Sequence, residues 1–271
     1  MAVLDFSGNK VHIMGILNVT PDSFSDGGKY DTVDKALKQA EKMVFEGAGI
    51  IDIGGESTRP YSDPISLAEE LDRIIPVIEK INSNMDAVIS VDTYKSKVAD
   101  EAMKAGAKII NDISGFTFDP EMEKIALKHD ACSIIMHIKG TPKNMQTDPH
   151  YDDVVAEVFD FLDQRQRSLK AIGLKKIIID PGFGFGKTLD DNYRLLKHLG
   201  KFARTGCPVL AGISRKSMIG KVVDMPPESR MPGTIALNTL AVLNGAKILR
   251  VHDVNENIQA VKLLKKYMNN I

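Results

Sequence analysis

The sequence predicts a single closed barrel of eight parallel β-strands, each followed by an α-helix. Short apolar runs alternate about eight times with amphipathic stretches, and no Pro/Ser-rich linker interrupts the alternation. The chain has 271 residues, a length that one barrel of this kind commonly occupies. We therefore expect one domain over residues 1–271. An open, doubly wound sheet remains the alternative that periodicity alone does not exclude.

Eight runs have the character of strands that are covered on both faces. Most of them are apolar throughout rather than alternating, as parallel strands between two layers are. The eight runs are residues 11–17, 49–53, 87–91, 107–110, 133–136, 176–179, 208–213 and 247–251.

Helical periodicity fills the intervals between these runs. Apolar residues from Val33 to Val44 follow helical spacing, and Gly47 marks the expected end of that helix. Ser66 and Glu69 form a capping-box pair ahead of the next helix, in which Pro76 predicts a kink or a late start. Further helices are centred on residues 98–105, 122–128, 154–169, 189–199, 235–243 and 258–267.

Composition narrows the class of partner. The chain is 43% hydrophobic and 26% charged, and its 35 basic and 36 acidic residues leave a net charge of −1 with no basic arm. A nucleic-acid partner is therefore not expected, because such a role needs a basic face. The sequence shows neither a signal peptide nor the ~18-residue apolar run of a membrane span, which favours the cytoplasm. Cys132 and Cys207 are expected to be buried free thiols.

Polar residues stand where the predicted strands end. In a parallel barrel the active site lies at the carboxyl ends of the strands, on the loops that lead into the helices. The polar residues at these ends are Asn18, residues 56–59, Asp92, Asn111, Asp112, His137, Asp180, residues 214–216 and residues 250–252. Because all eight strands deliver them to the same rim, we expect one shared ligand site.

The residue types indicate a flat, polar heterocycle as one ligand. Asp92, Asn111 and Asp180 offer acceptors, and a carboxylate can accept two N–H bonds in one plane. Lys216, with Ser214 nearby, brings a cation and a hydroxyl that suit a ring carbonyl or ring nitrogen.

The sequence also predicts an anion-binding group at the site and two long loops that cover it. Arg250 and His252 stand two residues apart, so both point to the same side, and together they suit an anion such as phosphate. The loops at 18–28 and 54–61 are longer than bare connections and are expected to cover the site. In the first of them, Phe24 is expected to pack against something when the loop closes.

A glycine-rich stretch at 182–188 resembles a phosphate-binding loop but does not match it. The P-loop pattern needs glycine at the position of Pro181, and the dinucleotide pattern fails because its last position is Lys187. We expect these glycines instead to let the backbone approach a flat ligand beside Asp180, with Phe185 as a stacking face. The sequence shows neither a His/Cys metal cluster nor a G-x-S-x-G nucleophile motif.

Seven motifs together resemble the dihydropteroate synthase family, in family order and over nearly the whole chain. The first two, IMGILNVTPDSFSDGG at 13–28 and IDIGGESTRP at 51–60, are the specific ones. The others are SVDT at 90–93, NDISG at 111–115, DPGFGFGK at 180–187, SRKS at 214–217 and RVHD at 250–253.

The resemblance implies a (β/α)8 barrel, usually a homodimer and a sulfonamide target. The implied reaction joins 6-hydroxymethyl-7,8-dihydropterin pyrophosphate to p-aminobenzoate in folate biosynthesis, releasing pyrophosphate. By family roles, the pterin is held by Asp92, Asn111, Met136, Asp180, Phe185 and Lys216. The pyrophosphate is held by Asn18, Arg59, Arg250 and His252, with Asn18 as a ligand of the cofactor Mg2+. The p-aminobenzoate site uses Phe24, Thr58, Pro60 and Ser217, and the catalytic residues are Asp26, Lys216 and Asp180.

The implied mechanism is a dissociative substitution, in which pyrophosphate departs before the arylamine attacks and Asp26 faces the electron-poor methylene. Residues 137–140 depart from the family pattern, with Ile138 and Lys139 where a Met and Arg pair is common, so the role of that loop is in doubt. Two alternatives remain. One is a methyltetrahydrofolate-dependent methyltransferase barrel, which should lack the first loop and the SRKS motif. The other is a non-catalytic pterin-binding paralogue.

Overall fold

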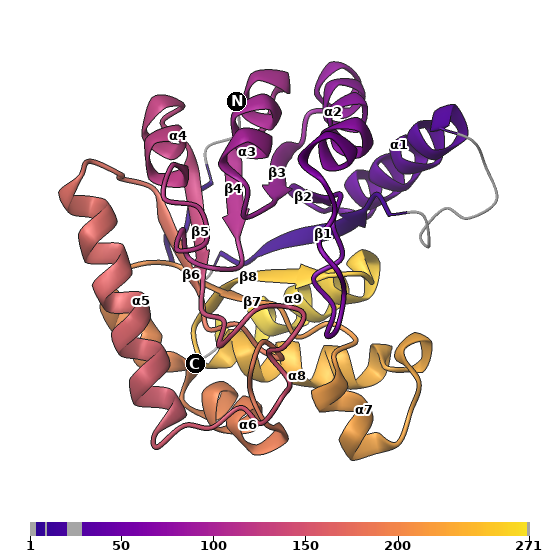
Figure 1. The fold of residues 1–271 in the computed structure, drawn as a ribbon. Helices are drawn as coiled ribbons and strands as arrows, with labels where there is room; N and C mark the ends of the chain where they lie inside the picture. Colours follow the sequence, from indigo (N-terminus) through magenta and orange to yellow (C-terminus); the bar gives the residue numbers. More distant parts are fainter. Residues whose placement is uncertain (1–3, 9, 21–28, 270–271) are drawn as a thin grey trace.

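The computed structural model describes residues 4–8, 10–20 and 29–269. Within them, eight parallel strands form a closed barrel whose order around the ring follows the chain (Figure 1). The strands are β1 (His12–Asn18), β2 (Ile50–Gly54), β3 (Val88–Asp92), β4 (Ile109–Asp112), β5 (Cys132–Met136), β6 (Ile177–Asp180), β7 (Val209–Ala211) and β8 (Ala246–Val251). Because β1 pairs with both β2 and β8, the ring is closed and the open-sheet alternative is wrong.

Helices surround the barrel on its outside (Figure 1). In the described part of the chain they are α1 (Lys29–Glu46), α2 (Leu67–Asn84), α3 (Ser96–Ala105), α4 (Met122–Lys128), α5 (Val154–Ala171), α6 (Leu189–Lys197), α7 (Ser217–Val223), α8 (Met231–Leu243) and α9 (Val254–Met268). Two short 3-10 segments, η2 (Leu199–Thr205) and η3 (Pro227–Ser229), lie in the connections. The short helix α7 was not predicted.

The end of α1 and the start of α2 follow signals that the sequence carries. Helix α1 ends at Glu46, and Gly47 follows with φ +107°, a conformation that suits glycine. Helix α2 begins at Leu67, and the Ser66 hydroxyl accepts a hydrogen bond from Glu69 N at 3.2 Å. Pro76 lies inside this helix, so the expectation of a late start there is wrong.

Strand β2 shows why the runs are apolar throughout. Ile50 points into the barrel interior, whereas Ile51 and Ile53 pack in the layer between the strands and the helices. Both faces are therefore buried, and each isoleucine contributes about 1.5–3 kcal/mol by leaving water. Asp52 is the exception, a fully buried carboxylate within this strand.

Two further expectations concern the thiols and the membrane. Cys132 and Cys207 are both free; Cys207 is buried and Cys132 is half-buried. None of the helices in the described ranges has the length and apolar character that a membrane crossing requires.

Candidate active site

The inner face of the barrel changes from apolar to polar between two successive layers. The lower layer consists of the buried side chains Met14, Ile50, Ile109, Ile134, Ile178, Leu210 and Ile248. Side chains alternate along a strand, so the residues two positions further also belong to the inner face. In the same order these are Ile16, Asp52, Asn111, Met136, Asp180, Gly212 and Arg250. The barrel mouth is thus lined by charged and amide groups above an apolar floor.

Arg250 joins the carboxylates of two neighbouring strands. Its Nε donates to Asp52 Oδ2 at 2.6 Å, and its Nη2 donates to Asp92 Oδ2 at 2.5 Å. The Asn111 amide also donates to Asp52 Oδ2, at 3.1 Å. The structure therefore places Arg250 among the predicted pterin residues, and it adds Asp52, which the sequence did not single out.

Two carboxylate oxygens of this cluster lack a hydrogen-bond donor among the described residues. Asp52 Oδ1 and Asp92 Oδ1 are buried and have no hydrogen-bond partner among the described residues. An unsatisfied buried acceptor costs about 1–3 kcal/mol, which a bound N–H donor would recover. Burial raises the pKa of Asp92 to about 7, with Arg250 opposing the shift and the charge of Asp52 adding to it.

A second cluster forms where β6 and β7 end. The Asp180 carboxylate accepts from Gly182 N at 2.7 Å, and burial raises its pKa while Lys216 opposes the shift. A Cβ added at Gly212 would lie 3.7 Å from both Asp180 Oδ2 and Lys216 Nζ, so the two groups flank this glycine. Lys216 donates to Phe183 O at 2.5 Å, and burial lowers its pKa to about 8.

Phe185 supplies the aromatic face of this cluster. The Lys216 ammonium lies 4.6 Å from the centroid of the Phe185 ring, a cation–π distance. Three predicted pterin residues therefore lie close together: Asp180 on β6, Phe185 in the loop after it, and Lys216 after β7.

The rim carries groups suited to an anion. Ser214 Oγ lies 3.0 Å from His252 Nδ1 and accepts from His252 N at 3.2 Å. Burial lowers the pKa of His252 to about 4, and the nearby cations Arg250, Arg215 and Arg59 lower it further. His252 is therefore a neutral hydrogen-bonding group near pH 7, placed among arginines.

Asn18 ends β1 beside the acidic cluster. Its Oδ1 would lie 3.7 Å from a Cβ at Gly54, and Asp92 Oδ2 would lie 3.8 Å from the same point. No group of three or more His, Cys, Asp or Glu side chains in the described ranges could hold a metal ion. The amide oxygen of Asn18 is the type of hard oxygen donor that a magnesium ion takes besides water and phosphate oxygens.

The second loop, residues 55–66, connects β2 to α2. Thr58 is half-buried, whereas Arg59 and Pro60 are exposed. Tyr61 N donates to Pro142 O at 2.9 Å, which ties the second loop to the connection after β5. Ser217 is exposed at the start of α7.

Phe24 and Asp26 lie outside the described residues.

Two glycines of the glycine-rich stretch pack closely against the connection after β5. Gly182 has φ +72° and Gly186 has φ +66°, and a Cβ at either would overlap a backbone carbonyl, of His137 and of Lys139 respectively. At these two positions the absence of a side chain allows close approach to the connection after β5, a role that the sequence did not predict. Lys187 holds the same contact, with Nζ 3.1 Å from His137 Nδ1.

Asp52 is the main site residue that sequence reasoning missed. It lies inside an apolar run, where a lone carboxylate between isoleucines was the available signal. Counting the alternation from Ile50 would have placed it on the inner face with Arg250.

Known proteins resemble this chain over most of its length. A family model described as pterin binding enzyme matches residues 14–252. A dihydropteroate synthase of Haemophilus influenzae is 49% identical over 95% of this chain and 94% of its own length. This chain belongs to the dihydropteroate synthase family.

Solved dihydropteroate synthases share the whole fold. One from Xanthomonas albilineans with 4-aminobenzoic acid has a TM-score of 0.92 at 42% identity, covering 98% of this chain and 95% of that one. Another from the same organism, in complex with 7,8-dihydropteroate, has a TM-score of 0.88 at 40% identity, with the same coverage of 98% and 95%. Family membership makes the chain an enzyme, a transferase of alkyl or aryl groups, and favours the synthase over the methyltransferase alternative.

Proposed function

We propose that this chain joins 6-hydroxymethyl-7,8-dihydropterin pyrophosphate to p-aminobenzoate, giving 7,8-dihydropteroate and pyrophosphate. The observation that carries the proposal is the inward polar layer, in which Asp52 and Asp92 each present a buried oxygen without a donor among the described residues. An amino-pyrimidinone edge offers the N–H groups that such oxygens accept. The synthases solved with 4-aminobenzoic acid and with 7,8-dihydropteroate support the two substrates.

The pterin would lie in the barrel mouth. Asp92, Asn111 and Asp180 would bind its polar edge, and Lys216 would donate to a ring carbonyl or nitrogen. The apolar surface would come from Met136, at the end of β5, and from Phe185, which Lys216 already contacts.

The pyrophosphate would lie at the rim, where positive charge gathers. Arg59 and Arg250 supply charge, and His252 supplies a neutral hydrogen-bonding group. Asn18 would hold Mg2+ through its amide oxygen, which fits an ion that keeps water and phosphate oxygens as its other ligands. Bound there, the ion would offset the charge of the departing phosphates.

p-Aminobenzoate would enter between the second loop and the start of α7. Thr58 and Pro60 lie on that loop and Ser217 begins α7, while Phe24 of the first loop would close over the ring. The arylamine nitrogen must reach the methylene carbon of the pterin, so this site has to adjoin the barrel mouth.

The chemistry we propose is dissociative. The bond between the methylene carbon and the pyrophosphate oxygen breaks, and its electron pair leaves with the oxygen. The resulting cation is delocalised into the dihydropterin ring, which Asp180 and Lys216 hold, while the Asp26 carboxylate stabilises the positive carbon. The arylamine then forms the carbon–nitrogen bond and loses one proton. Exclusion of water protects the cation from capture.

A pyrophosphate-release assay tests this function. We expect 7,8-dihydropteroate and pyrophosphate to form together when the dihydropterin pyrophosphate, p-aminobenzoate and Mg2+ are all present. A folded protein that binds the pterin but forms neither product would establish the non-catalytic paralogue instead.

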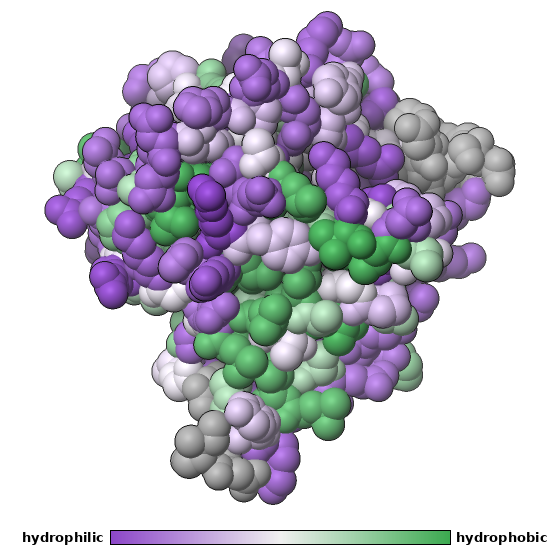
Figure 2. Space-filling view, turned by 90° about the horizontal axis from the view of Figure 1, so that it is seen from below, coloured by the Kyte–Doolittle hydropathy of each residue, from purple (hydrophilic) through white to green (hydrophobic). Residues whose placement is uncertain are grey.

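We also propose a cytoplasmic homodimer. Exposed apolar side chains gather on the face of the molecule that carries α7 and α8 (Figure 2); they are Val222, Val223, Met225, Leu240 and Leu243. A patch of this kind is typical of an interface between subunits. The free thiols of Cys132 and Cys207 suit a reducing compartment. Sedimentation of the wild type against Leu240→Arg tests the dimer, which the added charge should dissociate.

A further inference from the structure

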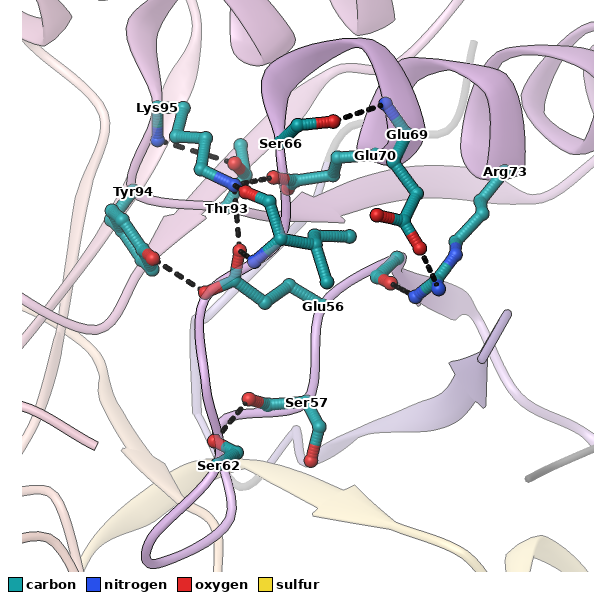
Figure 3. A network of polar contacts seen from close by, with 12 residues as sticks. Glu56, Ser57, Ser62, Ser66, Glu69, Glu70, Arg73, Thr93, Tyr94 and Lys95 are labelled. Atoms are coloured by element: carbon teal, nitrogen blue, oxygen red, sulfur yellow. Dashed lines mark hydrogen bonds and ion pairs between the residues drawn. The ribbon is translucent and has the colours of Figure 1, made fainter. Parts of the chain in front are cut away.

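The two ends of the second loop are bonded to each other and to Lys95, which follows β3 (Figure 3). At its start, the Glu56 carboxylate accepts from Tyr94 Oη at 2.5 Å and from Lys95 Nζ at 2.6 Å. At its end, Ile65 N donates to Glu56 Oε2 at 3.2 Å, and Ile65 O accepts from Lys95 Nζ at 2.8 Å. The loop is therefore closed at its base by one carboxylate and one ammonium group.

Lys95 also binds the helix that follows the loop. Its Nζ donates to Glu70 Oε2 of α2 at 2.7 Å (Figure 3). An ammonium group has three N–H donors, and those of Lys95 have three acceptors, on the loop start, the loop end and α2. One side chain thus fixes three segments relative to one another.

The cluster is buried, which makes its geometry costly to alter. The side chains of Glu56 and Glu70 are 6% and 1% exposed, and that of Lys95 is 19% exposed. Two buried carboxylates share a single cation, so loss of the ammonium would leave both charges uncompensated. Burial raises the pKa of Glu70 and the charge of Glu56 adds to that shift, whereas Lys95 opposes it.

The cluster connects the turn after β3, which follows Asp92, to the second loop. Tyr94 and Lys95 follow directly after Asp92 and Thr93, so the turn that carries the pterin carboxylate also anchors the second loop. Within the loop, Ser62 Oγ donates to Ser57 O at 2.6 Å and lies 2.8 Å from Arg59 O. The segment with Thr58, Arg59 and Pro60 is therefore braced from inside as well as at its base.

We propose that Lys95 is a positioning residue that presets the second loop for p-aminobenzoate. The inference rests on the proposed function, because it assigns that substrate to this loop. Lys95 touches no reacting atom; it acts by joining Glu56, Ile65 and Glu70. The predicted signature is a larger effect on p-aminobenzoate, which the loop binds through Thr58 and Pro60, than on the dihydropterin pyrophosphate, to which the loop contributes only Arg59.

The test compares KM for both substrates in Lys95→Met and in Glu56→Gln. We expect KM for p-aminobenzoate to rise by about tenfold or more, the effect of losing a hydrogen bond to a charged group. KM for the dihydropterin pyrophosphate should rise much less, because the loop contributes only Arg59 to that substrate. Lys104→Met is the matched control, because Lys104 is an exposed lysine of the neighbouring helix α3 with two acidic partners. Equal changes in both KM values, or no change, would overturn the proposal.

Hydrogen exchange separates this inference from the proposed function. Amides of residues 57–64 should exchange faster in Lys95→Met than in the wild type, whether or not the protein is active. Should Lys95→Met fail to fold, Tyr94→Phe and Glu56→Gln retain Lys95 and carry the same comparison. Unchanged exchange in these variants would show that the cluster does not hold the loop. An inactive wild type with faster loop exchange in the variants would contradict the proposed function alone.

Discussion

Asp180→Asn should weaken binding of the pterin substrate by about 10- to 150-fold. The Gly182 N bond of 2.7 Å goes to Oδ1, so an asparagine can keep it with its amide oxygen. The changed atom is Oδ2, which flanks Gly212 together with Lys216 Nζ. An NH2 group there would face a cation and the N–H donors of the ring. Losing one charge-assisted hydrogen bond costs about 1.5–3 kcal/mol, which corresponds to that range of Kd.

Calorimetric titration with the dihydropterin pyrophosphate, without p-aminobenzoate, measures this change. Asp190→Asn is the matched control, because it makes the same substitution at an exposed carboxylate in the first turn of α6. Asp26→Ala should differ from both by slowing turnover with little effect on pterin affinity. The reasoning is refuted if Asp180→Asn binds the pterin as the wild type does. An equal loss of pterin affinity in Asp26→Ala would refute the role given to the first loop.

Three further predictions concern Asp92, Lys187 and the glycines at positions 182 and 206. Because the charge of Asp52 raises the pKa of Asp92, Asp52→Asn should move the acidic limb of the kcat/KM profile from about pH 7 to lower pH; an unmoved or raised limb would contradict this. Burial lowers the pKa of Lys187 from 10.5 to about 7. Between pH 7 and pH 10.5 the unfolded chain therefore binds one more proton than the folded chain, and the free energy of unfolding rises with pH in this range. Lys187→Met should lose that rise in urea titrations at pH 7 and pH 9, and an identical pH dependence would show that Lys187 is not responsible. Gly206→Ala, with φ +74° and open space, should cost about 1 kcal/mol, whereas Gly182→Ala should cost several times more because its Cβ overlaps a carbonyl; equal Tm values would contradict the overlap.

The barrel was predictable because its strands carry a strong local signal. Strands buried on both faces are apolar at every position, and each predicted run overlaps an observed strand. The site at the strand ends was predictable as well, because parallel strands bring their carboxyl ends to one rim. Asp92, Asn111 and Asp180 therefore lie in the barrel mouth, as the sequence indicated.

The features that the sequence did not predict depend on contacts between segments that are distant in the chain. The bonds from Arg250 to Asp52 and Asp92 join β8 to β2 and β3, and nothing local to Arg250 specifies those partners. Helix α7 has seven residues and no side-chain hydrogen bond from its N-cap, Lys216, so it lacked a start signal. The contact between Gly182 and the connection after β5 likewise arises only when two distant segments meet.

A crystal structure of this chain with 7,8-dihydropteroate bound tests the central claim most directly. We predict that the pterin ring lies inside the barrel mouth, with its N–H groups on Asp92 and Asp180. The aminobenzoate portion should point toward Thr58 and Ser217. A pterin ring bound outside the mouth, with Asp52 Oδ1 and Asp92 Oδ1 still lacking a donor, would contradict the site described above.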